Sequence, residues 1–265
     1  MDELSSSPMA DKPQYVVCKE KDGMFQIILN RPPVNSFDIA MVDEITSIIA
    51  DQQYRSELKV LVFSAAGKAF SGGFSTEDFS EDRGFQLIEA FGRLFEQLES
   101  VTLPIISIVN GPAYGAGCEL VIFSDLAIAA ESAKLGFPEI RMGLFPALAS
   151  YLLPLKIHQK RAAELILTGD LLSAKDAERI GLINQAVPDD KLQEQAGIIV
   201  GKLLQFSAPV LKLAKQAMSR SHGKPPEEAI RTVEEIYVTE LLPLEDSREG
   251  IRAFNEKRKP AWKNR

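Results

Sequence analysis

The chain has 265 residues, of which 45% are hydrophobic and 25% charged, a balance typical of globular proteins and unlike disordered or fibrous chains. Thirty Lys and Arg against 37 Asp and Glu give a net charge of −7, so we expect no nucleic-acid partner. Two cysteines and two histidines are too few for a disulfide framework or a typical zinc cluster, so no metal site is expected. No apolar run approaches the roughly 20 residues of a membrane span, and the N-terminus is too acidic and polar for a signal peptide. These features predict a cytoplasmic protein without a membrane partner.

The N-terminal half alternates between strand and helix patterns. Residues 1–14 are polar and rich in Ser and Pro, and we expect a flexible tail. Apolar runs at 15–18 and 25–29, separated by the turn-like residues 21–23, predict a hairpin. The elements expected next are a helix over 39–49, a buried strand over 60–64, a helix over 87–98, a strand over 105–109, a helix over 119–123 and a strand over 126–129. This alternation is typical of an α/β protein.

The C-terminal part has a different pattern. Strand signals stop after about residue 188, and Leu192, Ala196, Ile199 and Leu203 follow helical spacing. The helices that follow are interrupted by prolines, which end helices. We therefore expect three parts, a tail over 1–14, an α/β unit over 15–188 and a helical subdomain over 189–265.

Two glycine-containing loops follow buried strands. The first, residues 67–75, has adjacent glycines that would let the backbone turn sharply and present bare N–H groups, although an ordinary turn explains it equally well. The second, residues 110–120, precedes an apolar helix and places N–H groups at the positive end of that helix. It lacks the third glycine of a dinucleotide-binding loop, because Leu120 stands there. Together the loops could supply donors to a developing oxyanion.

Two carboxylates accompany these loops. Glu119 begins an apolar helix, where it either caps the helix start or is desolvated. Glu139 follows a short strand and Pro138, and it is either a surface acid or part of a site. A pair of acids beside oxyanion donors could give and take protons. No Ser-His-Asp or Cys-His arrangement competes with this interpretation.

These segments resemble those of the crotonase superfamily, the enoyl-CoA hydratases and isomerases. The likeness runs from about Tyr15 to Asn264. It is carried by segments whose order and spacing together are specific: LNRP at 29–32, KAFSGG at 68–73, NGPAYGAGCE at 110–119, FPEIRMG at 137–143, LTG at 167–169, GLIN at 181–184 and FNEKRKP at 254–260. The resemblance implies a spiral of ββα units followed by helices that assemble homotrimers or dimers of trimers.

The resemblance also implies roles for particular residues. The backbone N–H groups of Phe74 and Ala116 would hold the thioester oxygen, and Glu119 and Glu139 would be the catalytic acids of a hydratase. The substrate would be an acyl-CoA thioester, with CoA as part of the substrate and no separate cofactor. The residues expected to contact CoA are Pro33, Val34, Lys68, Ser71 and Gly72, with added phosphate contacts from Lys257, Arg258 and Lys259.

The sequence departs from the family pattern around the acyl group. Phe74 stands where the hydratases have a small residue, and residues 147–150 replace a run of glycines. An acyl pocket edged by Phe74, Phe79, Phe145 and Leu148 would suit a flat, apolar or cyclic acyl group, while the same residues could be plain core. Residues 31–38 also resemble the branch that hydrates cyclohexadiene-carbonyl-CoA.

Three functions compete. The first is an enoyl-CoA hydratase type of lyase that adds water to a conjugated enoyl- or cyclic dienoyl-CoA. The second is another crotonase reaction, such as enoyl-CoA isomerisation or hydrolysis of a thioester or C–C bond. The third is an RNA-associated or other binding protein, which neither a basic stripe nor a run of aromatic residues supports.

Overall fold

The computed structural model describes residues 14–52, 55–79 and 83–265. The expected tail lies outside the described residues except for Gln14, whose backbone N–H donates to the carboxylate of Glu44.

The core of the molecule is a six-stranded sheet in the order β1-β2-β3-β4-β6-β9. Its first two strands form the predicted hairpin, with Val16 opposite Leu29 and Lys21 opposite Met24, and the other neighbours are parallel. The predicted strand at 60–64 is confirmed as buried on both faces. The strands of this sheet are β1 (Val16–Lys21), β2 (Met24–Leu29), β3 (Val60–Ala65), β4 (Ile105–Val109), β6 (Leu126–Ala130) and β9 (Gln185–Val187).

A second, three-stranded sheet lies beside the first and has the order β5-β7-β8. β5 (Ala113–Tyr114) lies parallel to β7 (Lys134–Gly136), which lies antiparallel to β8 (Leu171–Ser173). β5 comes from the second glycine loop, and β7 leads to Glu139. This small sheet therefore brings the two segments that carry the carboxylates together.

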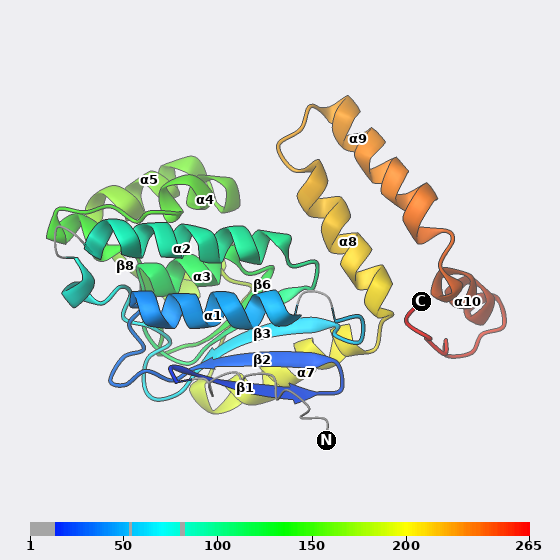
Figure 1. The fold of residues 1–265 in the computed structure, drawn as a ribbon, viewed down its shortest axis with the longest axis horizontal. Helices are drawn as coiled ribbons and strands as arrows, with labels where there is room; N and C mark the ends of the chain where they lie inside the picture. The colour runs from blue at the N-terminus through cyan, green and yellow to red at the C-terminus, as the bar shows by residue number, and fades with distance from the viewer. Residues whose placement is uncertain (1–13, 53–54, 80–82) are drawn as a thin grey trace, which may run out of the picture.

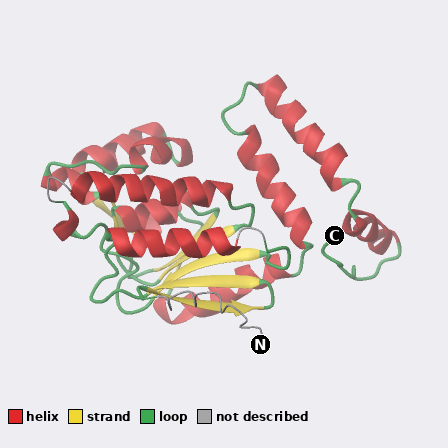
Figure 2. Ribbon diagram, in the orientation of Figure 1, coloured by secondary structure: helices red, strands yellow, loops and turns green. Residues whose placement is uncertain are grey.

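Helices cover both faces of the large sheet (Figures 1 and 2). One face packs against α1 and α2 through a large apolar cluster that includes Ile45, Phe63 and Phe91. The other face packs against α7, where Val62 and Ile106 belong to a second cluster with Leu192, Ala196 and Val200. The mixed α/β class is confirmed. The helices up to this point are α1 (Ile39–Gln52), η1 (Thr76–Asp78), α2 (Arg83–Ser100), α3 (Ala116–Phe123), η2 (Pro138–Met142), α4 (Ala149–Lys156), α5 (Gln159–Thr168), α6 (Ala174–Arg179), η3 (Asp189–Lys191) and α7 (Leu192–Leu204).

The last helices project from this body as an arm, residues 208–255 (Figure 1). The arm buries little within the protomer, since Ala208 is the buried residue of α8 and α9 has none. Its elements are α8 (Ala208–Ser221), α9 (Pro226–Glu235), the π-helical η4 (Ile236–Leu241) and α10 (Glu245–Asn255). Apolar side chains such as Met218, Ile230 and Phe254 are exposed on it.

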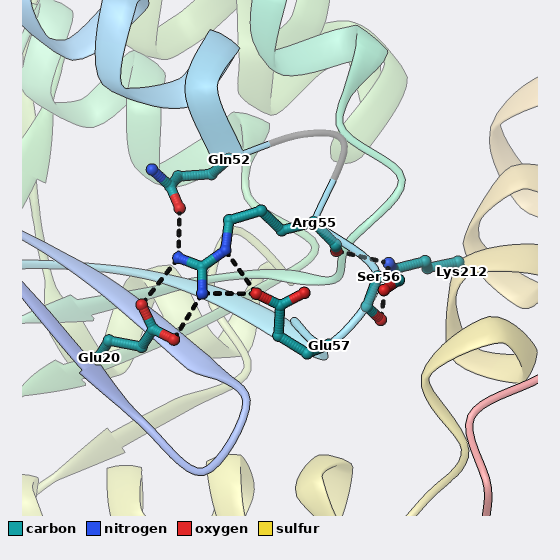
Figure 3. Close-up of polar contacts among 6 residues, drawn as sticks. All are labelled: Glu20, Gln52, Arg55, Ser56, Glu57 and Lys212. Atoms are coloured by element: carbon teal, nitrogen blue, oxygen red, sulfur yellow. Dashed lines mark hydrogen bonds and ion pairs between the residues drawn. The ribbon is translucent and has the colours of Figure 1, made fainter. Parts of the chain in front are cut away.

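Two lysines of α8, Lys212 and Lys215, bind the arm to the body. The Nζ of Lys212 donates to the carbonyl oxygens of Arg55 and Ser56 (Figure 3), at 3.1 and 3.4 Å. Lys215 donates to Leu103 O at 2.9 Å and pairs with Asp125 at 2.8 Å. The ammonium groups of both lysines thus bind backbone carbonyl oxygens of the body.

The segment that receives Lys212 is itself tied to the hairpin. The guanidinium of Arg55 binds both carboxylate oxygens of Glu20 on β1, at 2.7 and 2.8 Å, and pairs with Glu57 at 2.6 Å (Figure 3). The Oε1 of Gln52, at the end of α1, accepts a further bond from Arg55. One arginine thus joins β1, α1 and the approach to β3.

No single helix in the described part of the chain has the length and apolar character to cross a membrane. One pair, Asp189–Leu204 with Ala208–Ser221, passes on length and composition only when taken together, with a bend of 99°.

Candidate active site

The first glycine loop holds Phe74 from both sides. The N–H of Phe37 donates to Gly73 O and the N–H of Ser75 donates to Phe37 O, each at 2.8 Å. Gly73 has a φ of +91°, a conformation that favours glycine. Among the described residues, the N–H of Phe74 has no acceptor. The loop therefore presents one fixed, unpaired donor.

The second glycine loop presents another donor. The N–H of Gly115 donates to Gly136 O at 3.0 Å, and its φ of +49° turns the chain into α3. α3 begins at Ala116, whose N–H also lacks an acceptor in the described chain. A first-turn N–H has no partner within its own helix and lies at the positive end of the helix dipole.

The two loops lie against each other, which brings the two donors together. The N–H of Tyr114 donates to Ser71 O at 2.9 Å. A Cβ on Gly73 would stand 3.1 Å from Tyr114 O and 3.8 Å from the Cα of Gly115. Because Phe74 and Ala116 directly follow these two glycines, their free N–H groups are neighbours. Such a pair can hold one oxyanion.

Glu139 lies directly beside this pair. Its carboxylate rests on the Cα of Gly115, so closely that any Cβ there would overlap Oε1. The residue is only 6% exposed, and its Oε2 is buried without a partner among the described residues. The alternative that Glu139 is a surface acid is therefore wrong. Burial raises the pKa of Glu139 above its ordinary value, which favours the neutral acid.

Glu119 is fully buried, and one of its two carboxylate oxygens already accepts hydrogen bonds. Oε1 accepts the N–H groups of Leu148 and Ala149 at 2.7 and 2.8 Å, where α4 starts. Oε2 has no partner in the described chain. The alternative that Glu119 only caps its own helix is therefore wrong, because its bonds go to the start of α4.

The pKa of Glu119 lies close to neutral pH. Burial raises its pKa to about 7, the hydrogen bonds from Ala149 and Leu148 oppose that rise, and the nearby charge of Glu139 adds to it. A carboxylate with a pKa near 7 can exchange a proton at neutral pH in either direction. Each of the two glutamates thus offers one free, buried oxygen.

The residues expected to bind CoA divide into two groups. The N–H of Gly72 donates to Val34 O at 2.8 Å, and Pro33, Val34, Gly72 and Lys68 are exposed. The structure therefore joins residues 33–34 to Gly72 on the surface. Lys257, Arg258 and Lys259 are exposed beyond α10, and the guanidinium of Arg258 pairs with Glu249 and Glu256.

Ser71 lies inside the loop instead. Its hydroxyl donates to Asn35 O at 2.8 Å and accepts the N–H of Gly73 at 3.1 Å, and the residue is fully buried. Its side chain braces the turn that presents Phe74 and does not face solvent. The sequence did not single out Asn35, which completes this brace through bonds from its amide to Ala66 O and Ala69 O at 2.9 Å.

The residues expected to edge the acyl pocket differ in their exposure and contacts. The rings of Phe74 and Phe79 meet edge to face at 5.7 Å, and half-buried Leu148 is the residue whose N–H binds Glu119. Phe145 is 68% exposed and enters none of the ring contacts found among the described residues. Sequence reasoning missed Phe91, whose fully buried ring supports that of Phe74 at 4.7 Å. Its helical spacing indicated only a core position.

No three His, Cys, Asp or Glu side chains in the described ranges gather as they would around a metal ion. The free thiol of Cys118 is buried beside the glutamates, and burial raises its pKa, so it is no nucleophile near neutral pH.

Comparison with known proteins gives one consistent result. A family model described as Enoyl-CoA hydratase/isomerase matches residues 19–265. The chain is 31% identical to the mitochondrial enoyl-CoA hydratase domain-containing protein 3 of Xenopus laevis, over 97% of this chain and 89% of the relative. It is 33% identical to a probable enoyl-CoA hydratase of Rhizobium meliloti, over 90% of this chain and 94% of the relative.

Solved structures agree with this result. The crystal structure of an enoyl-CoA hydratase from Bacillus anthracis superposes with a TM-score of 0.91 at 30% identity, covering 95% of this chain and all of that one. The human enoyl-CoA hydratase domain-containing protein 3 superposes with a TM-score of 0.89 at 30% identity, covering 94% and 100%.

Proposed function

Since the chain belongs to the enoyl-CoA hydratase/isomerase family of the crotonase superfamily, we propose that it is a hydro-lyase that adds water to a conjugated enoyl-CoA thioester. One observation carries the proposal. Two buried glutamates, each with one unpartnered oxygen, lie beside two neighbouring N–H groups that have no acceptor in the described chain.

The backbone donors polarise the substrate. As water adds to the alkene, negative charge moves through the conjugated system to the thioester oxygen. The N–H groups of Phe74 and Ala116 would bind that oxygen, and the dipole of α3 favours the same charge. Because both donors are fixed before the substrate arrives, they need no reorganisation during the reaction. Loss of one such donor elsewhere typically costs about 2.7–4 kcal/mol.

The glutamates move the protons. Ionised Glu119 accepts a proton from water on its free Oε2, and the hydroxide adds to the carbon β to the carbonyl. Glu139, in its protonated form, gives its proton to the α carbon. Transfer of the proton from Glu119 to Glu139 restores the starting state, so one water molecule is added and nothing else is consumed.

The rest of the substrate would follow the exposed surface. We place CoA along Pro33, Val34 and Gly72, with Lys68 meeting its phosphates. We further propose a homotrimer or dimer of trimers, assembled through the arm and its exposed apolar side chains, and a cytoplasmic location. No separate cofactor takes part in this scheme.

The test is loss of conjugated enoyl-thioester absorbance with purified protein. Crotonyl-CoA, a longer straight-chain enoyl-CoA and cyclohexadiene-carbonyl-CoA are compared, with product identification. Glu119→Gln and Glu139→Gln should each lower kcat by about 10²–10⁴-fold. Glu164→Gln, which changes an exposed acid paired with Arg161, is the matched control and should keep the rate.

Two results would decide against hydration. A Glu119→Gln variant that hydrates enoyl-CoA at the rate of the natural chain would exclude the two-glutamate mechanism. A product with a shifted double bond and no added water would assign the same carboxylates to isomerisation, since a base and an acid beside an oxyanion site also suit proton transfer between carbons.

A further inference from the structure

Buried acidic side chains occur at four positions in the described ranges, and the mechanism uses two of them. The four are Asp78, Glu119, Glu139 and Asp246. Asp246 belongs to the arm, where it accepts the backbone N–H groups of residues 263 and 264. Asp78 instead ends η1, just after the first glycine loop, and is 3% exposed. A buried carboxylate is costly unless other groups bind it, so its contacts show which parts of the chain it holds together.

The direction of the Phe74 N–H depends on Phe37. This N–H shares one rigid peptide plane with the carbonyl group of Gly73 and points the opposite way, because the bond is trans. Gly73 O accepts the N–H of Phe37, and Phe37 O accepts the N–H of Ser75. Phe37 and Phe74 thus form an isolated parallel bridge. Any contact that fixes residues 37–39 against this loop therefore also aims the oxyanion donor.

Asp78 closes this bridge at its far end. In a longer parallel ladder, the N–H of Ile39 would be the next donor, and Ser75 O would accept it. Ser75 O instead accepts the N–H of Asp78 at 3.2 Å, and the Oδ2 of Asp78 accepts the N–H of Ile39 at 3.2 Å. Asp78 thus takes the place of the missing rung with its own main chain and side chain. Its carboxylate holds the first residue of α1 against the end of the loop.

The same carboxylate also binds the start of α2. Its Oδ1 pairs with the guanidinium of Arg83, the first residue of that helix, at 2.9 Å. The residue that follows Asp78 is Phe79, whose ring lies against that of Phe74 with the centroids 5.7 Å apart. Asp78 therefore joins the starts of two helices to the segment that supports Phe74.

From these contacts we infer that Asp78 is a positioning residue for the oxyanion donor of Phe74, an inference that rests on the proposed function. Asp78 acts through Ile39 and Phe37 and touches no reacting atom. Without its carboxylate the bridge relaxes, and the N–H of Phe74 turns away from the thioester oxygen. A displacement of about 1 Å at such a position can cost about 10²-fold in rate. The loss falls on the transition state, where that oxygen carries the most charge, so kcat should fall while substrate binding changes little.

The test compares two aspartates that have the same kind of partners. Asp125 lies beyond the opposite end of α3, where its Oδ2 accepts the N–H of Ile105 at 2.7 Å and pairs with Lys215 at 2.8 Å. Asp78→Asn should lower kcat for crotonyl-CoA by about ten-fold and Asp78→Ala by about 10²-fold, with little change in the Kd of butyryl-CoA. Asp125→Asn loses comparable contacts and should keep kcat.

Two conservative variants guard against a mere loss of folding. Asp78→Asn has nearly the volume of the natural side chain, and each variant is assayed well below its own unfolding midpoint. Arg83→Lys keeps a cation beside Asp78 and should retain most of kcat. Unchanged kcat in both Asp78 variants, or an equal fall in Asp125→Asn, would overturn the inference while leaving hydration intact.

A spectroscopic measurement separates this inference from the proposed function. A bound cinnamoyl-CoA absorbs at longer wavelength when hydrogen-bond donors draw electron density to its thioester oxygen, and this shift requires no hydration. At saturation the natural chain and Asp125→Asn should show the shift, and Asp78→Asn should show less of it. No shift in the natural chain, or the full shift in Asp78→Asn, would overturn the positioning role. A shift that depends on Asp78 without hydration of any enoyl-CoA would instead overturn the proposed function and retain the positioning role.

Discussion

The carboxylate of Glu139 lies on the Cα of Gly115, in space that any other residue would fill with its Cβ. Gly115 also adopts a φ of +49° and donates its N–H to Gly136 O. The position thus requires glycine for two independent reasons, the left-handed backbone and the approach of the acid.

Gly115→Ala should therefore inactivate the enzyme more than it unfolds it. The new Cβ displaces Glu139 and shifts the N–H of Ala116, so we expect kcat to fall by at least about 10²-fold. Thermal unfolding should show that backbone strain lowers the free energy of unfolding by about 1–3 kcal/mol. Gly92→Ala is the control, because a Cβ there meets nothing within 4 Å and the residue lies in α2. It should be neutral or stabilising by up to about 1 kcal/mol. An active Gly115→Ala enzyme would show that Glu139 does not need this position.

The buried carboxyl of Glu119 should make stability depend on pH. Its pKa is about 7 in the folded chain against an ordinary 4.5, because burial disfavours the charged form. Between these values the folded state binds more protons than the unfolded state. The free energy of unfolding should therefore fall as pH rises from about 4.5 to about 7, by on the order of 3 kcal/mol from this group.

Denaturant unfolding across this pH range checks that dependence. Glu119→Gln keeps an acceptor for Leu148 and Ala149 but has no charge, so it should lose the slope and exceed the natural chain in stability above about pH 7. In Glu139→Gln the slope should persist over a narrower range, since Glu139 contributes to the raised pKa. Hydration should fall as pH rises above about 7, because the two glutamates then hold no proton to give to the α carbon. A natural chain whose stability is flat over this range would contradict the assignment.

Asn35 should be among the least replaceable residues near the site. It is 3% exposed, has a φ of +54°, donates to Ala66 O and Ala69 O, and accepts the N–H of Arg31 at 2.8 Å. Asn35→Ala should cost about 3 kcal/mol or more, from the lost buried bonds and the left-handed backbone. Asn35→Gly loses the bonds but accepts the backbone, so it should be about 1 kcal/mol less damaging. Equal losses in the two variants would show that the backbone conformation contributes nothing.

The lysine contacts of the arm can be tested singly. Lys215→Met keeps the length of the side chain but removes its bonds to Leu103 O and Asp125, and a loss of about 1–3 kcal/mol is expected because the side chain is only 15% exposed. Lys175→Met removes an exposed pair with Glu131 and should change stability by less than about 1 kcal/mol. Chemical denaturation compares the two. Matching small effects would mean that the bonds of Lys215 contribute little to holding α8.

Local patterns in the sequence were sufficient for most of the body. The hairpin from Val16 to Leu29, the buried β3 and the alternation of strands with helices were predicted because each element has its own periodicity. Glu119 and Glu139 could be named as candidates, since each stands next to a glycine loop or a proline that marks it. Strands as short as β5, with two residues, carry no detectable alternation, and the small sheet was not predicted as a unit.

The partners of the site residues could not be predicted in the same way. Glu119 binds N–H groups 29 and 30 residues away, and no spacing rule links them. The family resemblance implied that Ser71 contacts CoA, and tertiary packing turns its hydroxyl inward. The support that Phe91 gives to Phe74 could not be predicted, because its helical spacing is that of any core residue.

The central strands and the arm should differ in how strongly they protect backbone amides from hydrogen exchange. The strands β3 and β4 lie in the centre of the large sheet with every residue of β4 buried, so their amides should exchange only when the whole body unfolds. α9 buries none of its residues within the protomer, so its amides should exchange through local opening at a much lower free energy. A second copy seated on the arm would slow exchange in α9 and leave β4 unchanged, which makes α9 an internal reporter of assembly.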